Sequence, residues 1–306
     1  MSLDKLHFRG GYNFLGLPAE ETRYENAHAV ILPVPYDSTT SYRAGTREGP
    51  AALLMASRNV ELYDLELDCE PLNTGVCTLP ELEPDMSGPQ ATIKNVEAAV
   101  AAICADHKFP VILGGEHSIS TGPVRALRKK YGEEFSILQL DAHADLRDSY
   151  ENTPYNHASV MRRVYELAEL TQVGIRNISS GEMEFVREAR HDGIFWAHDL
   201  QGPAESWIPR VVERLKKHVY ITIDLDVFDP SIMPAVGTPE PGGLLWYPVL
   251  QLLDAVVTKK NVVGFDVMEL CPIPGQIAGD FLAAKLVFKL LGKIFARNGW
   301  IDRGED

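Results

Sequence analysis

Residues 139–145, with the sequence Gln-Leu-Asp-Ala-His-Ala-Asp, place three side chains that can bind metal at alternate positions directly after an apolar run. The run, residues 135–140, is typical of a buried strand in a parallel sheet. Because strand side chains alternate with period two, extended backbone would turn Asp141, His143 and Asp145 to the same side. The chain is therefore expected to carry a polar cluster at the carboxyl end of a buried strand.

Two further clusters follow apolar runs in the same way. Asp224 and Asp226 come directly after residues 218–223, and Glu116 and His117 follow a run that stops at two glycines. Ligands of open α/β sheets collect at the carboxyl ends of the strands, which is where all three clusters fall. Carboxylates that meet there would repel one another unless cations lay between them. The sequence thus predicts a metal site built from several strand ends.

The ligand types limit which metal fits this site. Four aspartates and two histidines, without a thiolate, favour Mn²⁺, Mg²⁺ or Fe²⁺ over a structural zinc ion. Four carboxylates would overcompensate one divalent ion, whereas two ions about 3.5 Å apart balance the charge and can share bridging oxygens. We therefore expect a two-metal site.

Apolar runs alternate with amphipathic segments from residue 28 onward, which is typical of a parallel sheet covered by helices on both faces. The predicted strands are residues 28–33, 60–65, 110–113, 135–140, 171–175, 194–197, 218–223 and 262–267. The predicted helices are residues 50–59, 89–106, 119–131, 157–170, 181–189, 204–217, 247–258 and 278–296. The stretches 71–88 and 230–243, rich in Pro, Glu and Gly, are expected to be long surface loops rather than domain boundaries. We therefore expect one domain over residues 1–306.

A formal net charge of −14 argues against broad nucleic-acid binding, because the phosphate backbone requires a basic surface. The same charge suits a small cationic substrate. The four cysteines lack the paired spacing of metal fingers and are typical of reduced cytosolic thiols. Residues 1–10 lack the apolar core of a signal peptide, and no run approaches the length of a membrane span. We expect a cytoplasmic protein that binds neither nucleic acid nor membrane.

Three segments carry the polar clusters: Gly-Gly-Glu-His-Ser at 114–118, Asp-Ala-His-Ala-Asp at 141–145 and Asp-Leu-Asp-Val-Phe-Asp-Pro at 224–230. They closely resemble the three metal motifs of the ureohydrolases, the arginase and agmatinase family. Further matches lie at residues 33–50, 238–244 and 266–270, so the resemblance covers nearly the whole chain in the family's order. It implies a three-layer α/β/α fold with an eight-stranded, mainly parallel sheet.

The resemblance also implies two manganese ions per chain, held by residues of these motifs. The first ion is expected to bind His117, Asp141, Asp145 and Asp224. The second is expected to bind Asp141, His143, Asp224 and Asp226. Asp141 and Asp224 would then bridge the two ions. By the same resemblance we expect a homo-oligomer, either a trimer or a hexamer.

Three residues are expected to act in catalysis. By the resemblance, His157 carries a proton to the leaving amine, a role that suits an imidazole titrating near neutrality. The residues alone favour instead a helix start capped by Asn156. Glu269 matches the glutamate that binds the guanidinium, since a carboxylate can accept two parallel hydrogen bonds from it. Asp266 is the alternative, although the period-two pattern turns it to the opposite face. Asp145, a predicted ligand, is included among the catalytic groups.

Three other residues near the motifs have expected roles outside the chemistry. Glu116 is expected to orient the neighbouring His117. Asp229, directly before a proline, is expected to support a turn. Cys271 has no histidine base beside it in the sequence, so nucleophilic catalysis by this thiol is not expected.

The substrate is expected to lack an amino-acid head group. Arginases use the aspartate of a Gly-Leu-Arg-Asp pattern for the α-ammonium group, whereas this chain has Gly-Ile-Arg-Asn at 174–177, with neutral Asn177. Residues 146–150 also differ from the arginase loop that binds the α-carboxylate. These differences favour agmatine, cleaved to putrescine and urea by attack of a metal-bridging hydroxide. The alternatives are guanidinobutyrate, guanidinopropionate, aminopropylagmatine, arginine and formiminoglutamate, or a metal-binding scaffold without turnover, against which His157 and Glu269 argue.

Overall fold

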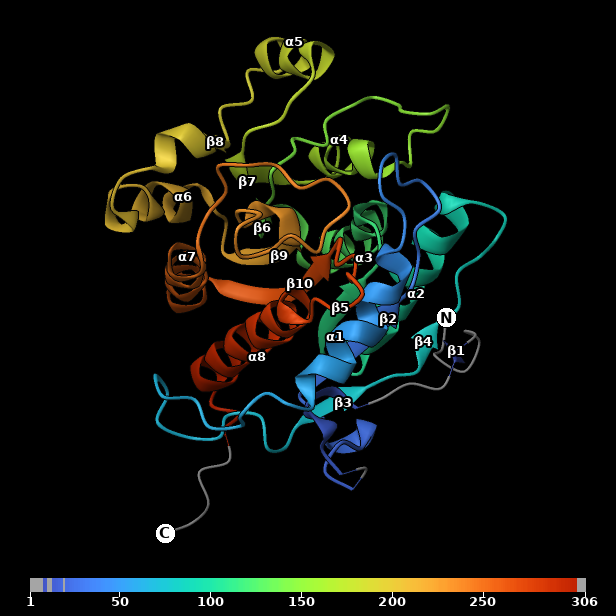
Figure 1. Ribbon diagram of the computed structural model, residues 1–306, viewed down its shortest axis with the longest axis vertical. Coiled ribbons are helices and arrows are strands. Elements are labelled where there is room, and N and C mark those ends of the chain that lie inside the picture. Colours follow the sequence, from blue (N-terminus) through green and yellow to red (C-terminus); the bar gives the residue numbers. More distant parts are fainter. Residues whose placement is uncertain (1–7, 10–12, 19, 302–306) are drawn as a thin grey trace.

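Eight parallel strands form the central sheet in the computed structural model, which describes residues 8–9, 13–18 and 20–301 (Figure 1). The order across the sheet is β3-β2-β5-β10-β9-β6-β7-β8. The strands are β2 (Ala29–Val34), β3 (Val76–Thr78), β5 (Phe109–Gly114), β6 (Phe135–Leu140), β7 (Glu169–Ile175), β8 (Ile194–Trp196), β9 (His218–Asp224) and β10 (Asn261–Met268). A separate antiparallel pair joins β1 (Phe8–Arg9) to β4 (Glu81–Leu82).

Helices cover both faces of this sheet. One face packs against α1 (Gly49–Ser57), α6 (Ile208–Arg214), α7 (Trp246–Lys259) and α8 (Ala278–Asn298). The other packs against α2 (Pro89–Ala105), α3 (Thr121–Tyr131), α4 (Val160–Tyr165) and α5 (Ser180–Glu188). Figure 1 shows α1 and α8 next to each other on the first face. The predicted three-layer α/β/α fold is confirmed.

Each face of the sheet has its own apolar core, because successive strand side chains point to opposite faces. In β2, Ala29 and Ile31 belong to the core with α1 and α8. Val30, Leu32 and Val34 belong to the core with α2 and α3. Burial on both faces explains why this strand is an unbroken apolar run rather than an alternating one.

The strand predicted at residues 60–65 is wrong, and the sheet takes β3 from the stretch expected to be a surface loop. Asp64 decides this, because its carboxylate accepts hydrogen bonds from the backbone N–H groups of Glu66 and Leu67 and turns the chain. Asp64 is also buried in an ion pair with Lys289 of α8, at 2.9 Å. Two predicted helices, residues 157–170 and 204–217, are too long, because apolar residues continue at helical spacing beyond the helix ends. In the structure α4 ends at Tyr165 and α6 begins only at Ile208.

The ends of the chain are described only in part. Most of residues 1–10, where the sequence predicts no signal peptide, lie outside the described residues. No helix in the described part of the chain combines the length and the apolar character needed to cross a membrane.

Candidate metal centre and substrate pocket

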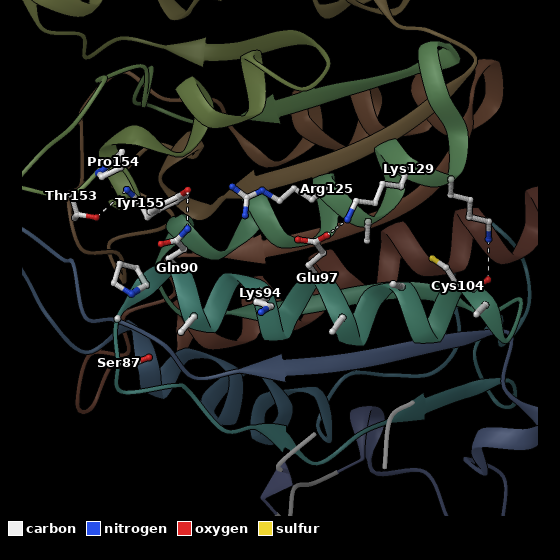
Figure 2. A pocket seen from close by; sticks show the side chains of 18 of the residues that line it. Ser87, Gln90, Lys94, Glu97, Cys104, Arg125, Lys129, Thr153, Pro154 and Tyr155 are labelled. Atoms are coloured by element: carbon white, nitrogen blue, oxygen red, sulfur yellow. Dashed lines mark hydrogen bonds and ion pairs between the residues drawn. The ribbon is translucent and has the colours of Figure 1, made fainter. Parts of the chain in front are cut away.

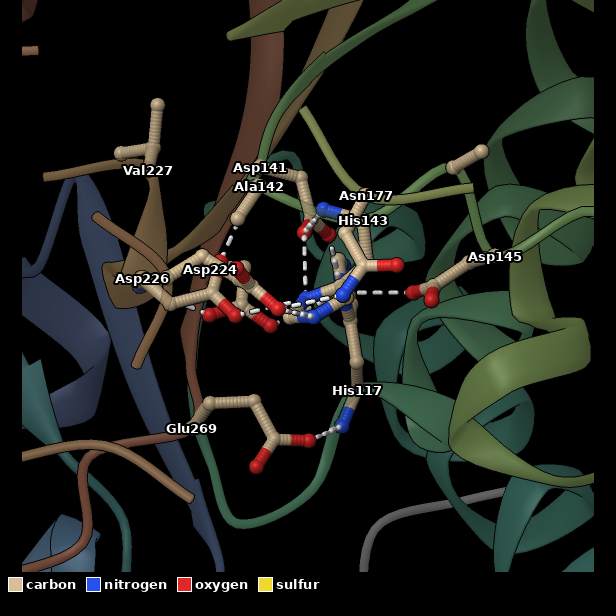
Figure 3. A network of polar contacts seen from close by, with 12 residues as sticks. His117, Asp141, Ala142, His143, Asp145, Asn177, Asp224, Asp226, Val227 and Glu269 are labelled. Atoms are coloured by element: carbon tan, nitrogen blue, oxygen red, sulfur yellow. Dashed lines mark hydrogen bonds and ion pairs between the residues drawn. The ribbon is translucent and has the colours of Figure 1, made fainter. Parts of the chain in front are cut away.

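The predicted ligands follow three strands of the sheet, β5, β9 and β6, and β10 lies between β5 and β9. His117 follows β5, and the Asp141–Asp145 segment follows β6. Asp224 is the last residue of β9, and Asp226 lies in the short turn after it. Parallel strands bring all their carboxyl ends to one edge, so residues about a hundred positions apart meet there. Figure 3 shows their carboxylates surrounding the imidazole rings of His117 and His143.

Two glycines allow the strand end at β5 to lie against its neighbours. A Cβ atom on Gly115 would lie 2.0 Å from the carbonyl oxygen of Tyr36, and one on Gly114 would lie 1.9 Å from Sδ of Met268. The contact at Gly115 is with backbone, so this position requires glycine, whereas a larger residue at Gly114 would force the Met268 side chain to move. The close approach lets the backbone of Glu116 donate to Tyr36 O at 2.7 Å and that of Glu269 donate to Gly115 O at 2.8 Å.

The ligand atoms form two groups that share Asp141. One group comprises His117, Asp141 and Asp145, and the other comprises Asp141, His143 and Asp226, with the ligand atoms of each group within 4.8 Å of one another. His117 Nδ1 lies 3.0 Å from Asp141 Oδ2 and 3.4 Å from Asp145 Oδ2. His143 Nδ1 lies 2.8 Å from Asp226 Oδ2. The shared position of Asp141 agrees with the bridging role expected for it.

Asp224 was the second residue expected to bridge. Its Oδ2 lies 3.4 Å from His117 Nδ1, and its Oδ1 accepts a hydrogen bond from the backbone N–H of Asp226 at 2.9 Å. It is not part of either of the two groups of ligand atoms, so the structure places it beside the His117 group without showing a bridge.

The hydrogen bonds around His117 prepare it to bind a cation. Thr222 donates its hydroxyl hydrogen to Ser120 and therefore accepts from His117 Nε2, which lies 2.7 Å away. In this arrangement Nδ1, which is buried without a hydrogen-bond partner among the described residues, would offer its lone pair to a cation. A metal ion bound there would stabilise a buried nitrogen lone pair that faces three carboxylates. This donor set fits divalent cations.

The electrostatics of the cluster point the same way. Burial, and after it the charge of Asp141, raises the pKa of Asp145 to about 7. Burial and the charges of Asp226 and Asp141 raise the pKa of Asp224 well above its usual range. Burial alone would lower the pKa of His143, but Asp226 and Asp141 raise it to about 12. The buried carboxylates therefore carry excess negative charge, which protons must neutralise when no cations are bound. Two divalent ions would relieve the same excess.

A pocket of about 160 Å³ opens onto this cluster. Its lining includes four predicted ligands, His117, His143, Asp145 and Asp224, together with His157 and Glu269. A larger groove of about 1300 Å³ lies elsewhere, between α2 and α3, and is lined by alanines and basic side chains (Figure 2). That groove contains none of the predicted ligands, so the smaller pocket is the candidate active site.

His157 lies in the pocket and also begins a short helical turn, so the expected helix start is present and the proton-transfer role stays a prediction. Asn156 caps the turn by accepting a hydrogen bond from the backbone N–H of Ala158 at 2.9 Å. The Nε2 atom of His157 lies 3.2 Å from Ser41 Oγ, whereas Nδ1 is buried with no hydrogen-bond partner in the part of the chain that the structure describes. Burial lowers the pKa of His157 to about 4, so the imidazole is neutral at pH 7 and able to accept a proton.

Glu269 lies directly after β10 in a conformation that few residues other than glycine adopt, with φ of 66°. Its Oε1 accepts the backbone N–H of His117 at 2.7 Å, which ties it to the metal cluster. Asp266, the alternative, does not line the pocket and accepts a hydrogen bond from the Tyr220 hydroxyl at 2.8 Å. Strain of this kind is concentrated at functional sites, where the surrounding structure maintains it.

The expectation that Glu116 orients the ring of His117 is wrong. Its buried carboxylate accepts hydrogen bonds from Thr39 and Ser118, and the ring of His117 is held by Thr222. The sequence interpretation missed Thr39 and Ser41, although the matched segment 33–50 contains both.

Asn177 lines the pocket, as expected from the substrate argument. Its side-chain amide donates a hydrogen bond to Glu240, a residue that the sequence interpretation also missed. Glu240 Oε1 lies 3.9 Å from Nε2 of the predicted ligand His143. The position that holds an aspartate in arginases is thus occupied here by an amide that is paired with a carboxylate.

Comparisons with known proteins agree with this geometry. The sequence matches the Arginase family over residues 27–292, a range that includes the whole parallel sheet and every predicted site residue. The N(1)-aminopropylagmatine ureohydrolase of Synechocystis sp. is 42% identical over 89% of this chain and 90% of its own length. The agmatinase of Pyrococcus horikoshii is 37% identical over 88% and 92%, respectively. The crystal structure of agmatine ureohydrolase from Thermoplasma volcanium has a TM-score of 0.82 and 35% identity, covering 90% of this chain and 93% of that chain.

Proposed function

This chain belongs to the arginase family, and from that membership we propose that it hydrolyses the guanidino group of an amine that lacks a carboxylate. It is a metal-dependent amidinohydrolase. Neutral Asn177, paired with Glu240 beside the pocket, is the observation that supports this substrate class. Asn177 leaves no aspartate at the position that holds an α-ammonium group in arginases, and the carboxylate of Glu240 supplies negative charge beside a cationic substrate.

Agmatine and its N1-aminopropyl derivative are the two substrates that fit this class. The relative from Synechocystis sp. named for aminopropylagmatine shares more identity with this chain than the agmatinase from Pyrococcus horikoshii, at 42% against 37%. We therefore place aminopropylagmatine first. Agmatine, which the sequence alone favours, remains the second candidate because the solved structure from Thermoplasma volcanium is an agmatine ureohydrolase.

We further propose that the cofactor is two Mn²⁺ ions, held by His117 and His143 and by the four aspartates of the cluster. Two such ions supply Lewis acidity that activates water near neutral pH. Hard oxygen donors with two imidazoles support manganese over zinc.

The residues of the chain then position the substrate and move the proton. Glu269 accepts hydrogen bonds from the guanidinium N–H groups, since each carboxylate oxygen has two lone pairs and only one is used by His117. Neutral His157 takes up a proton in the pocket and passes it to the amine nitrogen as the carbon–nitrogen bond breaks. The products are urea and the free amine. Both roles require side chains that metal binding alone would not need.

A panel of guanidino compounds tests the substrate class. With Mn²⁺ supplied, aminopropylagmatine and agmatine are expected to release urea with a kcat/KM at least about a hundredfold above that of arginine, because burying the arginine carboxylate without a partner costs a few kcal/mol. Guanidinobutyrate is the matched control, since it carries a carboxylate in place of the terminal aminomethyl group of agmatine. Arginine turnover equal to that of agmatine would contradict the proposal.

We also propose that the chain acts in the cytoplasm as a homo-oligomer. Apolar side chains near the amino ends of α7 and α8 are exposed, including Tyr247 and Ile277, whose exposed fractions are 69% and 76%. Contact with a further copy of the chain would cover such side chains. Light scattering coupled to size-exclusion chromatography is expected to give three or six times the chain mass of 33.9 kDa. A mass of one chain at micromolar concentration would contradict this proposal.

A further inference from the structure

The loop that follows β2 is fastened to the buried carboxylate of Glu116. The backbone N–H of Thr39 donates to Oε2 at 2.6 Å, and its hydroxyl donates to Oε1 at 2.5 Å. Glu116 has no exposed surface, and Ser118 Oγ also donates to Oε1 at 2.5 Å. The two oxygens of this buried carboxylate thus hold two adjacent donors of a single residue. The position of Thr39 is therefore fixed by the segment that also carries His117.

The same threonine holds His157 on its other side. The single hydroxyl hydrogen of Thr39 is used by Glu116, so the oxygen accepts the backbone N–H of His157, at 3.1 Å. The carbonyl oxygen of Thr39 accepts from Nδ2 of Asn156 at 3.3 Å. Two residues further along the loop, Ser41 Oγ lies 3.2 Å from the ring nitrogen Nε2 of His157. The loop thus contacts the backbone, the helix cap and the ring of the histidine region.

We propose that Glu116 and Thr39 are positioning residues that set the place of the His157 imidazole in the pocket. This inference rests on the proposed function, in which His157 carries the proton. Neither Glu116 nor Thr39 lines the pocket, so neither contacts the substrate. The effect of Thr39 on turnover is therefore expected to pass through the loop to His157.

Replacing Thr39 by valine tests the connection, because valine keeps the shape of the side chain and removes the hydroxyl. The Thr39→Val variant is expected to lose roughly tenfold to a hundredfold in kcat, the scale of a small misplacement of a catalytic group. KM and the manganese content are expected to stay unchanged. Thr39→Ser, which keeps the hydroxyl, is expected to restore kcat to near the wild-type value.

Thr171→Val is the matched control for loss of a buried threonine hydroxyl. Thr171 lies in β7 with an exposed fraction of 1%, and its hydroxyl is buried without a hydrogen-bond partner among the described residues. It does not line the pocket. This variant is expected to keep the wild-type kcat.

A double-mutant cycle separates positioning from a general structural effect. In the His157→Ala background, Thr39→Val is expected to cause no further loss of kcat, because the group that it positions is gone. An equal loss in both backgrounds would overturn the inference, as would a Thr39→Val enzyme with the kcat of the wild type. If Thr39→Val fails to fold, Glu116→Gln gives the same cycle, since an amide in place of one carboxylate oxygen cannot accept both hydrogen bonds of Thr39.

Failure of the proposed function gives a different result. Absence of urea release by the wild-type enzyme from every compound of the panel rejects that function, whatever the variants do. A crystal structure of the Thr39→Val variant would show directly where the His157 ring lies. The expected change is a His157 ring displaced from Ser41, and an unmoved ring would overturn the inference.

Discussion

The Asp224→Asn variant is expected to lose metal from both positions and to fall by at least about a thousandfold in kcat. The substitution removes one negative charge from a buried cluster and replaces a carboxylate oxygen beside His117 Nδ1 with an amide. Loss of a partner outside the ligand set typically costs 10–100-fold in metal affinity or activity, and loss of a predicted bridging ligand should exceed that. Metal analysis by mass spectrometry and kinetics on the same preparation would measure both effects.

Asp229→Asn is the matched control for that experiment. Asp229 belongs to the same sequence motif, but its carboxylate accepts the backbone N–H groups of Ser231, Gly242 and Gly243 and lies outside the cluster. Its variant is expected to retain both ions. Two ions bound to Asp224→Asn would show that this residue does not bridge, and a fully active wild-type enzyme with one ion would contradict the two-metal proposal.

The parts of the fold that the sequence predicts best are those where one physical signal dominates. Strand β6 has the bounds expected for it, residues 135–140, because an unbroken apolar run of that length fits a strand buried on both faces. The segment at 60–65 has a similar apolar content, but the turn-forming Asp64 and its buried ion pair with Lys289 prevent a strand there. A pattern of apolar residues in one segment does not indicate that a distant side chain such as Lys289 will form a buried ion pair with it.

The candidate site divides in the same way. The proximity of residues that follow strand ends could be predicted from the sequence, because the carboxyl ends of parallel strands lie at one edge of the sheet. The partners of His157 could not, since Thr39 lies 118 positions before it in a loop whose path depends on the fold. The role of Glu116 was misjudged for the same reason. Its neighbour in sequence is His117, but its hydrogen-bond partner Thr39 is 77 positions away.

The His157→Ala variant is expected to keep both metal ions and to lose roughly 10²–10⁴-fold in kcat, the range for removal of a group that transfers a proton. The ring of His157 is not part of either group of ligand atoms, so its loss should leave metal affinity unchanged. Because Glu269, rather than His157, is proposed to hold the guanidinium, KM should change little. Metal content and steady-state kinetics with agmatine and aminopropylagmatine would be measured on one preparation.

His198→Ala controls for loss of a histidine as such, because the His198 side chain is 77% exposed and lies outside the pocket. It should keep the wild-type kcat. Loss of metal from His157→Ala would show that the residue acts as a ligand or maintains the fold, and an unchanged kcat would remove it from the mechanism. The pKa of His157 is about 4, so its imidazole is neutral at pH 7. It can therefore pass a proton to the amine only after the reaction has supplied that proton. Retained metal together with a large loss in kcat is therefore the one result that supports proton transfer through this residue.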